Sequence, residues 1–496
     1  MSQDLEIPKL ENYGLTASSG FLPGEFPVTR LSDKYYKPWE TIVGKLPSLL
    51  LSKKIRSVVD RLPTLEVKTS LLENLAELRR SYSVLCFITN AYIWGYDEPC
   101  EILPDCVAQP LLIISEKLGL PPLATYAGLV LWNFEPVVDL DLPAFLDGDF
   151  DLHDIMTINT FTGGIDESWF YLVSVFFERT GAQCMENGLK AIHDVRNGNS
   201  ESLVGHLESI AEGIDGLGSI LMRMDEMCDP HIFYFRIRPY LAGWRNMEDV
   251  GLPKGVKYGK KGSFQQYAGG SNAQSSLIQM LDILLGVEHF SSGKKHSAGG
   301  KISAKTGSNS FINEMRNYMP REHRNFLEHL EKVSNIRDYV LSHKNDEKLL
   351  VAYDACLAML KSFRDKHIQI VTRYVVMQAS KKSVAGKGNT LRSGLSKSHG
   401  KKEQKGTGGT SLMPFLKQCR DETGVAAASE WGQKILSAGV LKVEDSSSIV
   451  GIKKHSPSEI DDGGNVVSKK MKLGLAGDWS SEEDNEESEV RHAGHW

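Results

Sequence analysis

Helical periodicity constrains the fold of this chain more than any other feature of its sequence. Apolar residues recur at three- and four-residue spacing, the period of a buried helix face, in four long segments at 167–195, 199–227, 273–290 and 346–379. Strand-like alternation is scarce, and its main candidate is the run FYFRIRPYL at 233–241. We therefore predict a protein of the mostly α class.

Changes in composition divide the helical segments into two blocks. A Pro/Asp-rich passage without clear period follows the first block, and Gly/Ser/Lys-rich stretches, typical of flexible loops, interrupt the second. In chain order we predict an extended arm (1–30), a small helical domain (31–135), a connecting segment (136–164), a large helical domain (165–424) with flexible insertions at 291–310 and 381–406, and a disordered acidic tail (425–496) without a catalytic role.

Charge and cysteine usage exclude several classes of protein. A formal net charge of −6 at pH 7 argues against a general nucleic-acid-binding surface, which needs a basic excess. The seven cysteines form no CxxC pair, and the first residues lack the layout of a signal peptide, so we expect free thiols in a reducing compartment. The longest apolar run, at 169–177, is about half the roughly 20 residues that a membrane helix needs. We expect a soluble, cytoplasmic protein.

The segment from about 346 to 378 predicts a long helix with a histidine on its apolar face. His367 continues the apolar stripe that includes Leu360, Phe363 and Tyr374, and by this interpretation no other histidine lies on an apolar helix face. Periodicity alone leaves two alternatives open, a core histidine with satisfied hydrogen bonds and a metal or haem ligand. A neutral imidazole on a rigid helix beside an apolar cavity is what a proximal haem ligand requires.

Two charged residues in apolar surroundings are candidates for a buried pair. Arg364 lies three residues before His367, near the same helix face, where an unpaired guanidinium is costly. Asp282, in the apolar run LIQMLDILLGV, is a possible partner. The alternative is that each side chain reaches water at the edge of a helix.

Two loops and one arginine-containing run are further candidates for ligand binding. In YAGGSNAQSS at 267–276, Gly269 and Gly270 let the backbone approach a flat ligand, and the serines that follow can cap a helix. GTGGT at 406–410 can wrap a small ligand with backbone donors, although such a run is more often a flexible hinge. In FYFRIRPYLAGW, Arg236 or Arg238 can grip a carboxylate; an edge strand with solvated arginines is the alternative.

Five runs in the same order resemble the indoleamine 2,3-dioxygenase family, and the resemblance covers most of residues 30–420. The runs are AGGSNAQSS followed by LDILLGVEH, YMPREHRNFLEHL, SFRDKHIQIVTRYV and KGTGGTSLMPFLK. The resemblance implies a two-domain, all-helical haem dioxygenase fold with a small helical domain over a large haem-binding one. The insertion near 291–310 and the C-terminal tail are additions of the kind that fungal-like members carry.

The resemblance also implies roles for individual residues. His367 matches the proximal ligand of a haem b iron, Arg238 the arginine that binds the substrate carboxylate, and Asp282 with Arg364 a pair behind the histidine. The remaining matches concern the substrate and haem pocket: Phe170, Phe233 and Tyr126 around the indole, Ser174 above the haem, Gly270 and Ser271 in the loop beside it, and Thr407 near the substrate ammonium and a haem propionate. Gly128, Leu129 and Asn272 depart from the mammalian pattern, which puts substrate affinity in doubt more than the chemistry.

The implied reaction is cleavage of the indole C2–C3 bond of L-tryptophan by O₂ to N-formyl-L-kynurenine, the first step of the kynurenine pathway, which can feed NAD biosynthesis. We expect a monomer that needs an electron donor to keep the haem ferrous, and that binds neither nucleic acid nor a membrane. The alternatives are a non-catalytic haem or O₂ sensor and a signalling scaffold that uses the acidic tail. His367 together with Arg238 favours the enzyme, because neither alternative needs a carboxylate clamp.

Overall fold

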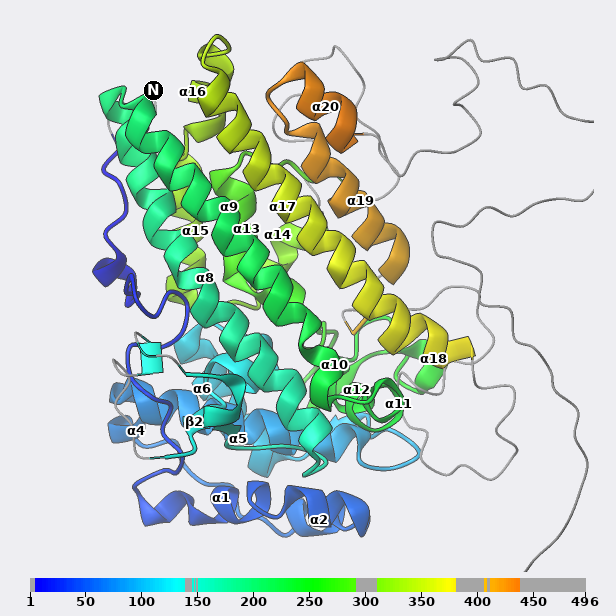
Figure 1. Cartoon of the computed structure of the whole chain (residues 1–496). Coiled ribbons are helices and arrows are strands. Elements are labelled where there is room, and N and C mark those ends of the chain that lie inside the picture. The colour runs from blue at the N-terminus through cyan, green and yellow to red at the C-terminus, as the bar shows by residue number, and fades with distance from the viewer. Residues whose placement is uncertain are drawn as a thin grey trace, which may run out of the picture. The chain divides into compact units, whose positions relative to one another are not determined.

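A computed structural model describes residues 5–138, 145–146, 148, 150–290, 310–380, 406–407 and 411–437, and the structural statements below concern these residues. They all belong to one unit, Met1–Val440, within which the helices lie as Figure 1 shows. The predicted insertions at 291–310 and 381–406 lie outside the described residues except at Ser310 and Gly406. The mostly α class is confirmed, whereas the division into two domains stays a prediction.

Four long helices form the bundle that carries most of the site. The helices are α8 (Ile165–Asn197), α9 (Ser200–Met222), α17 (Glu347–Val371) and α19 (Leu412–Val425). α9 packs against both α8 and α17, and α19 packs against α17 (Figure 1). Gly198, with φ +66°, ends α8, and the Asn199 side chain caps α9 by accepting a hydrogen bond from the Ser202 amide. This short turn makes α8 and α9 antiparallel neighbours.

Helix α13 (Ser276–Leu284) lies very close to α8 because two glycines face it. A Cβ atom on Gly181 would lie 2.0 Å from Leu277 Cδ2, and a Cβ atom on Gly188 would lie 2.4 Å from Leu284 Cδ1. Both positions are seven residues apart on one face of α8, so leucines of α13 fit where α8 has no side chain. The sequence signal for this contact is only the pair of glycines inside a helical pattern.

The N-terminal block is built around α5 (Leu75–Trp94), whose residues from Ser81 to Trp94 are all buried. Asn90 of α5 donates to the Tyr240 carbonyl oxygen (2.8 Å) and accepts from the Ala124 amide (3.2 Å), and Trp94 donates to the Ala242 carbonyl oxygen (2.9 Å). The block therefore holds two segments that lead to candidate site residues, Tyr126 and Arg238.

The remaining α-helices have 14 residues or fewer. They are α1 (Lys37–Val43), α2 (Leu46–Leu51), α3 (Ile55–Val59), α4 (Thr69–Glu73), α6 (Asp105–Leu118), α10 (Met224–Met227), α11 (Pro230–Ile232), α12 (Arg238–Leu241), α14 (Ser310–Arg316), α15 (Arg321–Val333), α16 (Ile336–Ser342), α18 (Met377–Ser380) and α20 (Glu430–Ser437). None of the described helices is long and apolar enough to span a membrane.

Two small sheets complete the described structure. β1 (Ile102–Leu103) pairs in parallel with β4 (Val256–Tyr258), which pairs antiparallel with β5 (Phe264–Gln265). β2 (Phe134–Pro136) pairs antiparallel with β3 (Ile155–Thr157), so Pro136, the first residue of the predicted connecting segment, lies beside Ile155 within that segment.

The predicted strand at 233–241 is wrong, because this run is helical. A π-helical turn, Phe233–Ile237, continues directly into α12. Pro230 at the first helical position and Asp229, whose side chain accepts from the His231 and Ile232 amides, start the helix. The buried side chains of this run have a helical spacing: Phe233, Tyr234, Ile237 and Arg238. The alternation of aromatic and basic residues in the sequence conceals this spacing.

The predicted start of the disordered tail at residue 425 is too early. Ala426, Ala427 and Ala428 are buried, and α20 follows them. Asp354 of α17, itself buried, accepts hydrogen bonds from the Ala428 amide (2.7 Å) and the Ser429 amide (3.1 Å). The polar composition after residue 424 does not reveal this contact, because the contact is made by backbone amides and small side chains. The part of the tail after residue 437 lies outside the described residues.

The predicted N-terminal arm packs on the large helical block. Phe21 is 2% exposed and its ring lies 5.0 Å from that of His323 and 5.9 Å from that of Phe326, both on α15. The arm therefore buries apolar side chains although it contains little regular secondary structure.

We predict that a chain ending at residue 424 is less stable than a chain ending at residue 437. The shorter chain loses the hydrogen bonds that Ala428 and Ser429 donate to Asp354 and the burial of Ala426, Ala427 and Ala428. Each hydrogen bond contributes about 1 kcal/mol. Denaturant unfolding of both chains measures the difference. Equal unfolding free energies for the two chains would show that α20 contributes nothing to the fold.

Candidate active site

A largely apolar cavity of about 280 Å³ lies between α8, α12, α13, α17 and α19. All the residues that the sequence analysis placed in the site line it, namely Tyr126, Phe170, Ser174, Phe233, Arg238, Gly270, Ser271, Asp282, Arg364, His367 and Thr407. The fold therefore brings together side chains from six separate stretches of the chain.

Three π-helical turns contribute to the cavity wall. They are Ala127–Leu131, Phe233–Ile237 and Thr372–Val376, and each supplies lining residues, among them Leu129, Phe233 and Tyr374. A π turn inserts one residue into a helix and so changes which side chains share a face; such turns are frequent at functional sites. Nothing in the helical periodicity of the sequence indicates them.

His367 presents a neutral imidazole to the cavity. It lies on α17 between the buried side chains of Phe363 and Ile370, and it lines the cavity. Burial, and to a smaller extent the nearby Arg364 cation, lowers the pKa of His367 to about 4. The imidazole is therefore uncharged at neutral pH, which is the form that can bind a metal.

A second buried histidine shows why the sequence alone could not single out His367. His323 on α15 is 6% exposed, and burial followed by Arg79 lowers its pKa to about 3. It contacts Ser276 Oγ at 3.2 Å and does not line the cavity. The prediction that no other histidine lies on an apolar helix face is wrong, and His323 has the role of a core histidine.

Aromatic side chains and one hydroxyl form another part of the wall. The ring of Phe233 lies 4.9 Å from that of Phe170 and 5.7 Å from that of Tyr374. Ser174, one helical turn after Phe170, donates a hydrogen bond to the Phe170 carbonyl oxygen at 3.3 Å. This wall offers flat apolar surfaces to a ligand and few polar atoms.

Arg238 brings a positive charge to this apolar space. It is 3% exposed, and its guanidinium carbon lies 5.3 Å from the centre of the Tyr234 ring. Burial lowers the pKa of Arg238, partly offset by Tyr234, but an arginine stays protonated. Among the described lining residues, Arg364 and Asp282 pair with each other, and Arg238 is the third charged side chain. Arg236 is exposed, so the two arginines are in different environments.

The two glycine-containing loops meet at the cavity. The Gly269 amide donates to the Thr407 carbonyl oxygen at 3.2 Å. A Cβ atom on Gly269 would lie 2.2 Å from the Leu241 carbonyl oxygen, and one on Gly270 would lie 2.6 Å from Leu129 Cδ1. The absence of a side chain at both glycines thus permits close packing of protein against protein. Gly270 also lines the cavity, and its approach to a flat ligand stays a prediction. Ser271 caps the short turn after it, as expected, by accepting from the Ala273 amide.

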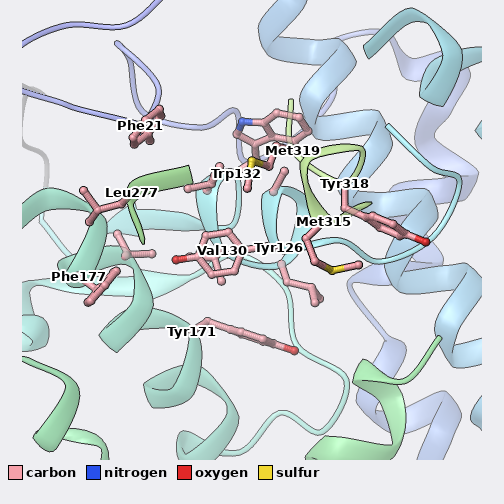
Figure 2. Packing of buried hydrophobic residues seen from close by; sticks show 14 of the residues in the cluster. Phe21, Tyr126, Val130, Trp132, Tyr171, Phe177, Leu277, Met315, Tyr318 and Met319 are labelled. Atoms are coloured by element: carbon pink, nitrogen blue, oxygen red, sulfur yellow. The ribbon is translucent and has the colours of Figure 1, made fainter. Parts of the chain in front are cut away.

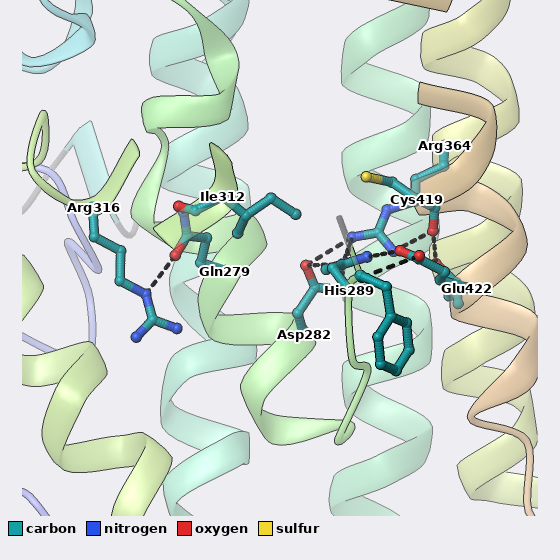
Figure 3. A network of polar contacts seen from close by, with 10 residues as sticks. Gln279, Asp282, His289, Ile312, Arg316, Arg364, Cys419 and Glu422 are labelled. Carbon is teal, nitrogen blue, oxygen red and sulfur yellow. Dashed lines mark hydrogen bonds and ion pairs between the residues drawn. The ribbon is translucent and has the colours of Figure 1, made fainter. Parts of the chain in front are cut away.

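A buried network of charges surrounds Arg364, which lies three residues before His367 on α17 (Figure 3). Arg364 Nη2 lies 2.7 and 2.8 Å from the two Asp282 carboxylate oxygens, which confirms the predicted pair. His289 Nε2 lies 3.1 Å from Asp282 Oδ2, and His289 Nδ1 lies 2.7 Å from Glu422 Oε2. Arg364 also donates to Thr423 Oγ1 and to the Cys419 carbonyl oxygen on α19. The network joins α13, α17 and α19.

The network holds His289 as a cation. Burial opposes the charge, but Asp282 and Glu422 outweigh it and raise the pKa of His289 well above its usual value. Burial likewise raises the pKa of Asp282, but Arg364 and His289 outweigh it and the pKa falls. Two cations and two anions then cancel. The ligand atoms of His289, Cys419 and Glu422 lie within 4.8 Å of one another, as a metal site requires, but the balanced charges need no metal.

The sequence analysis missed His289, Glu422 and a third buried group, Glu178. The carboxyl group of Glu178, on α8, accepts from the Tyr126 hydroxyl at 2.9 Å and the Ser275 hydroxyl at 2.6 Å. Ser275 occupies the N-cap position of α13, as expected, but its side chain makes no capping hydrogen bond. An acidic residue within the apolar stripe of α8 was the available signal for Glu178.

We predict that the stabilisation from His289 depends on pH. Because the pKa of His289 is raised in the folded protein, its contribution is fully present below about pH 6.5, the value in an unfolded chain, and is lost as the pH rises through the folded pKa. His289→Gln should lower the unfolding free energy by about 3 kcal/mol at pH 6, and by less as the pH rises. Denaturant unfolding across this range measures the effect.

The same substitution at His193, which is exposed on α8, is the matched control and should change stability little. A destabilisation by His289→Gln that grows with pH would contradict the cationic assignment.

Comparison with known proteins places the chain in a family. Residues 9–426 match the family model described as indoleamine 2,3-dioxygenase. An indoleamine 2,3-dioxygenase of Saccharomyces cerevisiae is 48% identical over 431 residues, which cover 84% of this chain and 93% of that protein. A 6-hydroxytryptophan 2,3-dioxygenase of Fusarium equiseti is 36% identical, covering 84% of this chain and 96% of that protein. Human indoleamine 2,3-dioxygenase 2 is 33% identical, covering 84% and 94%. The chain belongs to the indoleamine 2,3-dioxygenase family.

Proposed function

We propose that this protein is a haem-dependent dioxygenase that cleaves the indole C2–C3 bond of L-tryptophan with O₂ to give N-formyl-L-kynurenine. The observation that carries the proposal is that a neutral histidine, His367, and a buried cation, Arg238, line one apolar cavity. The membership of the family and the names of its relatives support the same reaction.

The residues of the cavity fit a haem b. His367 would hold the iron through its uncharged imidazole, and the apolar lining suits the macrocycle. Arg364, three residues before His367, is fixed by Asp282, Thr423 and the Cys419 carbonyl oxygen, which keeps this turn of α17 in place. Gly270 and Ser271 would lie beside the group. When bound, the haem supplies the O₂ binding and redox chemistry, with an external electron donor keeping the iron ferrous.

The chain itself would bind and orient tryptophan. Arg238 would hold the carboxylate through paired, charge-assisted hydrogen bonds, and Ser271 and Thr407 would lie near the ammonium group. Phe170, Phe233 and Tyr126 would enclose the indole ring and exclude water. The Ser174 hydroxyl, which now donates to the Phe170 carbonyl oxygen, would turn toward the cavity to donate to O₂ or to a water molecule there.

The alternatives of a haem sensor or a scaffold need no substrate clamp, so the buried Arg238 favours the enzyme. We further propose that the protein works as a monomer and that it is located in the cytoplasm. The free cysteines agree with the reducing conditions of that compartment. Turnover of L-tryptophan with a reductant, followed by the absorbance of N-formylkynurenine, tests the reaction. A haem spectrum that responds to tryptophan without product formation would favour the sensor.

We predict that His367→Ala loses haem, because the cavity then lacks its neutral nitrogen ligand. The haem-to-protein ratio and the visible spectrum of the purified variant measure the loss. His323→Ala is the control, because it removes a buried helix histidine that does not line the cavity, and its folded fraction should keep haem. A His367→Ala protein with stoichiometric haem and an unchanged ferric spectrum would refute the ligand assignment.

We predict that Arg238→Ala keeps haem but raises KM for L-tryptophan by about 10²-fold or more, the effect of losing a pair of charge-assisted hydrogen bonds. Steady-state kinetics on the haem-loaded variant measure the change. Arg236→Ala, two residues away and exposed, should leave KM unchanged. If Arg236→Ala raises KM and Arg238→Ala does not, the carboxylate is bound elsewhere.

A further inference from the structure

Glu178 carries a buried carboxyl group that has no role in the binding of haem or tryptophan proposed above. It lies on α8, one helical turn after Ser174, is 1% exposed and does not line the cavity. Its Oε1 atom accepts hydrogen bonds from the Tyr126 hydroxyl (2.9 Å) and the Ser275 hydroxyl (2.6 Å). Its Oε2 atom is buried and has no hydrogen-bond partner among the described residues. Two donors thus converge on one oxygen.

The two donors come from different parts of the cavity wall. Tyr126 lies directly before the π turn Ala127–Leu131, and Ser275 directly before α13; both line the cavity. Gln274 Oε1 accepts from the Tyr126 amide at 2.9 Å, and Gln274 Nε2 donates to the Gly269 carbonyl oxygen at 2.8 Å. Figure 2 shows the Tyr126 hydroxyl turned toward the side where Phe177 of α8 lies. Glu178 therefore ties α8 to Tyr126 and to the 269–275 loop.

The contacts favour the protonated form of this carboxyl group. An ionised carboxylate would leave a negatively charged oxygen buried without a donor, which is costly. A neutral acid instead accepts both hydroxyl donors through its carbonyl oxygen. In agreement, burial raises the pKa of Glu178 to about 7, although the hydrogen bonds from Ser275 and Tyr126 oppose the shift. A neutral amide can reproduce this acceptor.

We propose that Glu178 is a positioning residue for tryptophan binding, which fixes the Tyr126 ring and the 269–275 loop against α8 by accepting their two hydroxyl hydrogen bonds. The inference rests on the proposed function, because it names the part of the wall that encloses the indole. Glu178 does not touch the substrate and acts through its two donors. Its loss should therefore weaken binding more than it slows the chemical step.

Two substitutions at Glu178 test the proposal in the haem-loaded protein. Glu178→Leu removes the acceptor and should raise KM about tenfold, the effect of one or two lost hydrogen bonds, with kcat and haem content changed by less than about twofold. Glu178→Gln keeps a neutral acceptor oxygen and should leave KM within about twofold. A Leu variant with unchanged KM, or a Gln variant as impaired as the Leu variant, would overturn the proposal.

A combined variant separates positioning from a general structural role. In the Tyr126→Phe, Ser275→Ala background both donors are absent, and replacing both partners of a hydrogen bond by apolar groups is nearly neutral. Adding Glu178→Leu to this background should therefore change KM by less than about twofold. A full tenfold effect in this background would show that Glu178 acts by another route, and would contradict the inference.

Amide hydrogen exchange in the absence of tryptophan tests the positioning role of Glu178 without relying on the proposed reaction. Glu178→Leu should speed amide exchange in peptides that contain Tyr126 and residues 269–275, whereas Glu178→Gln should not. Unchanged exchange in the Leu variant would overturn the positioning role even if the enzyme turns over tryptophan. Absence of turnover by the unmodified protein would refute the proposed function, and the exchange data would still decide whether Glu178 fixes this wall.

Discussion

The buried ion pair between Arg364 and Asp282 is the contact on which the cavity depends. Arg364 is on α17 and Asp282 on α13, and the other donors of the guanidinium reach α19. A buried ion pair adds little net stability compared with apolar packing, but separating its members leaves an uncompensated charge, which is strongly unfavourable. The pair therefore restricts these three helices to one arrangement, and His367 lies on the helical turn that it fixes.

The two histidines nearest this pair show how the surroundings of a side chain decide its chemistry. His289 lies between two carboxylates and is held as a cation in spite of its burial. His367 faces the cavity beside the Arg364 cation and stays neutral. The cationic histidine can only donate hydrogen bonds, whereas the neutral one keeps a nitrogen lone pair for a ligand. One buried region thus contains both forms at the same pH.

Features that depend on neighbours along the chain were predictable from the sequence. The spacing of apolar residues predicted α17 and the position of His367 on it, and the charged residues in apolar runs predicted the Arg364–Asp282 pair. Features that depend on distant partners were not. Ser275 and Glu178 are 97 residues apart, and His289 and Glu422 are 133 apart, so no local pattern joins them. The run at 233–241 was misassigned because the local alternation of aromatic and basic residues conceals the helical spacing of its buried side chains.

The glycines of α8 have a consequence for changing the substrate range of the enzyme. Leu277 and Leu284 of α13 occupy the space that side chains at Gly181 and Gly188 would fill, and the same helix presents Ile278, Gln279 and Asp282 to the cavity. The absence of side chains at Gly181 and Gly188, which lie outside the cavity, thus sets the distance between α8 and α13. A designer who wishes to admit a bulkier indole can widen the space by enlarging these outer positions, and can leave every residue that touches the substrate in its native form.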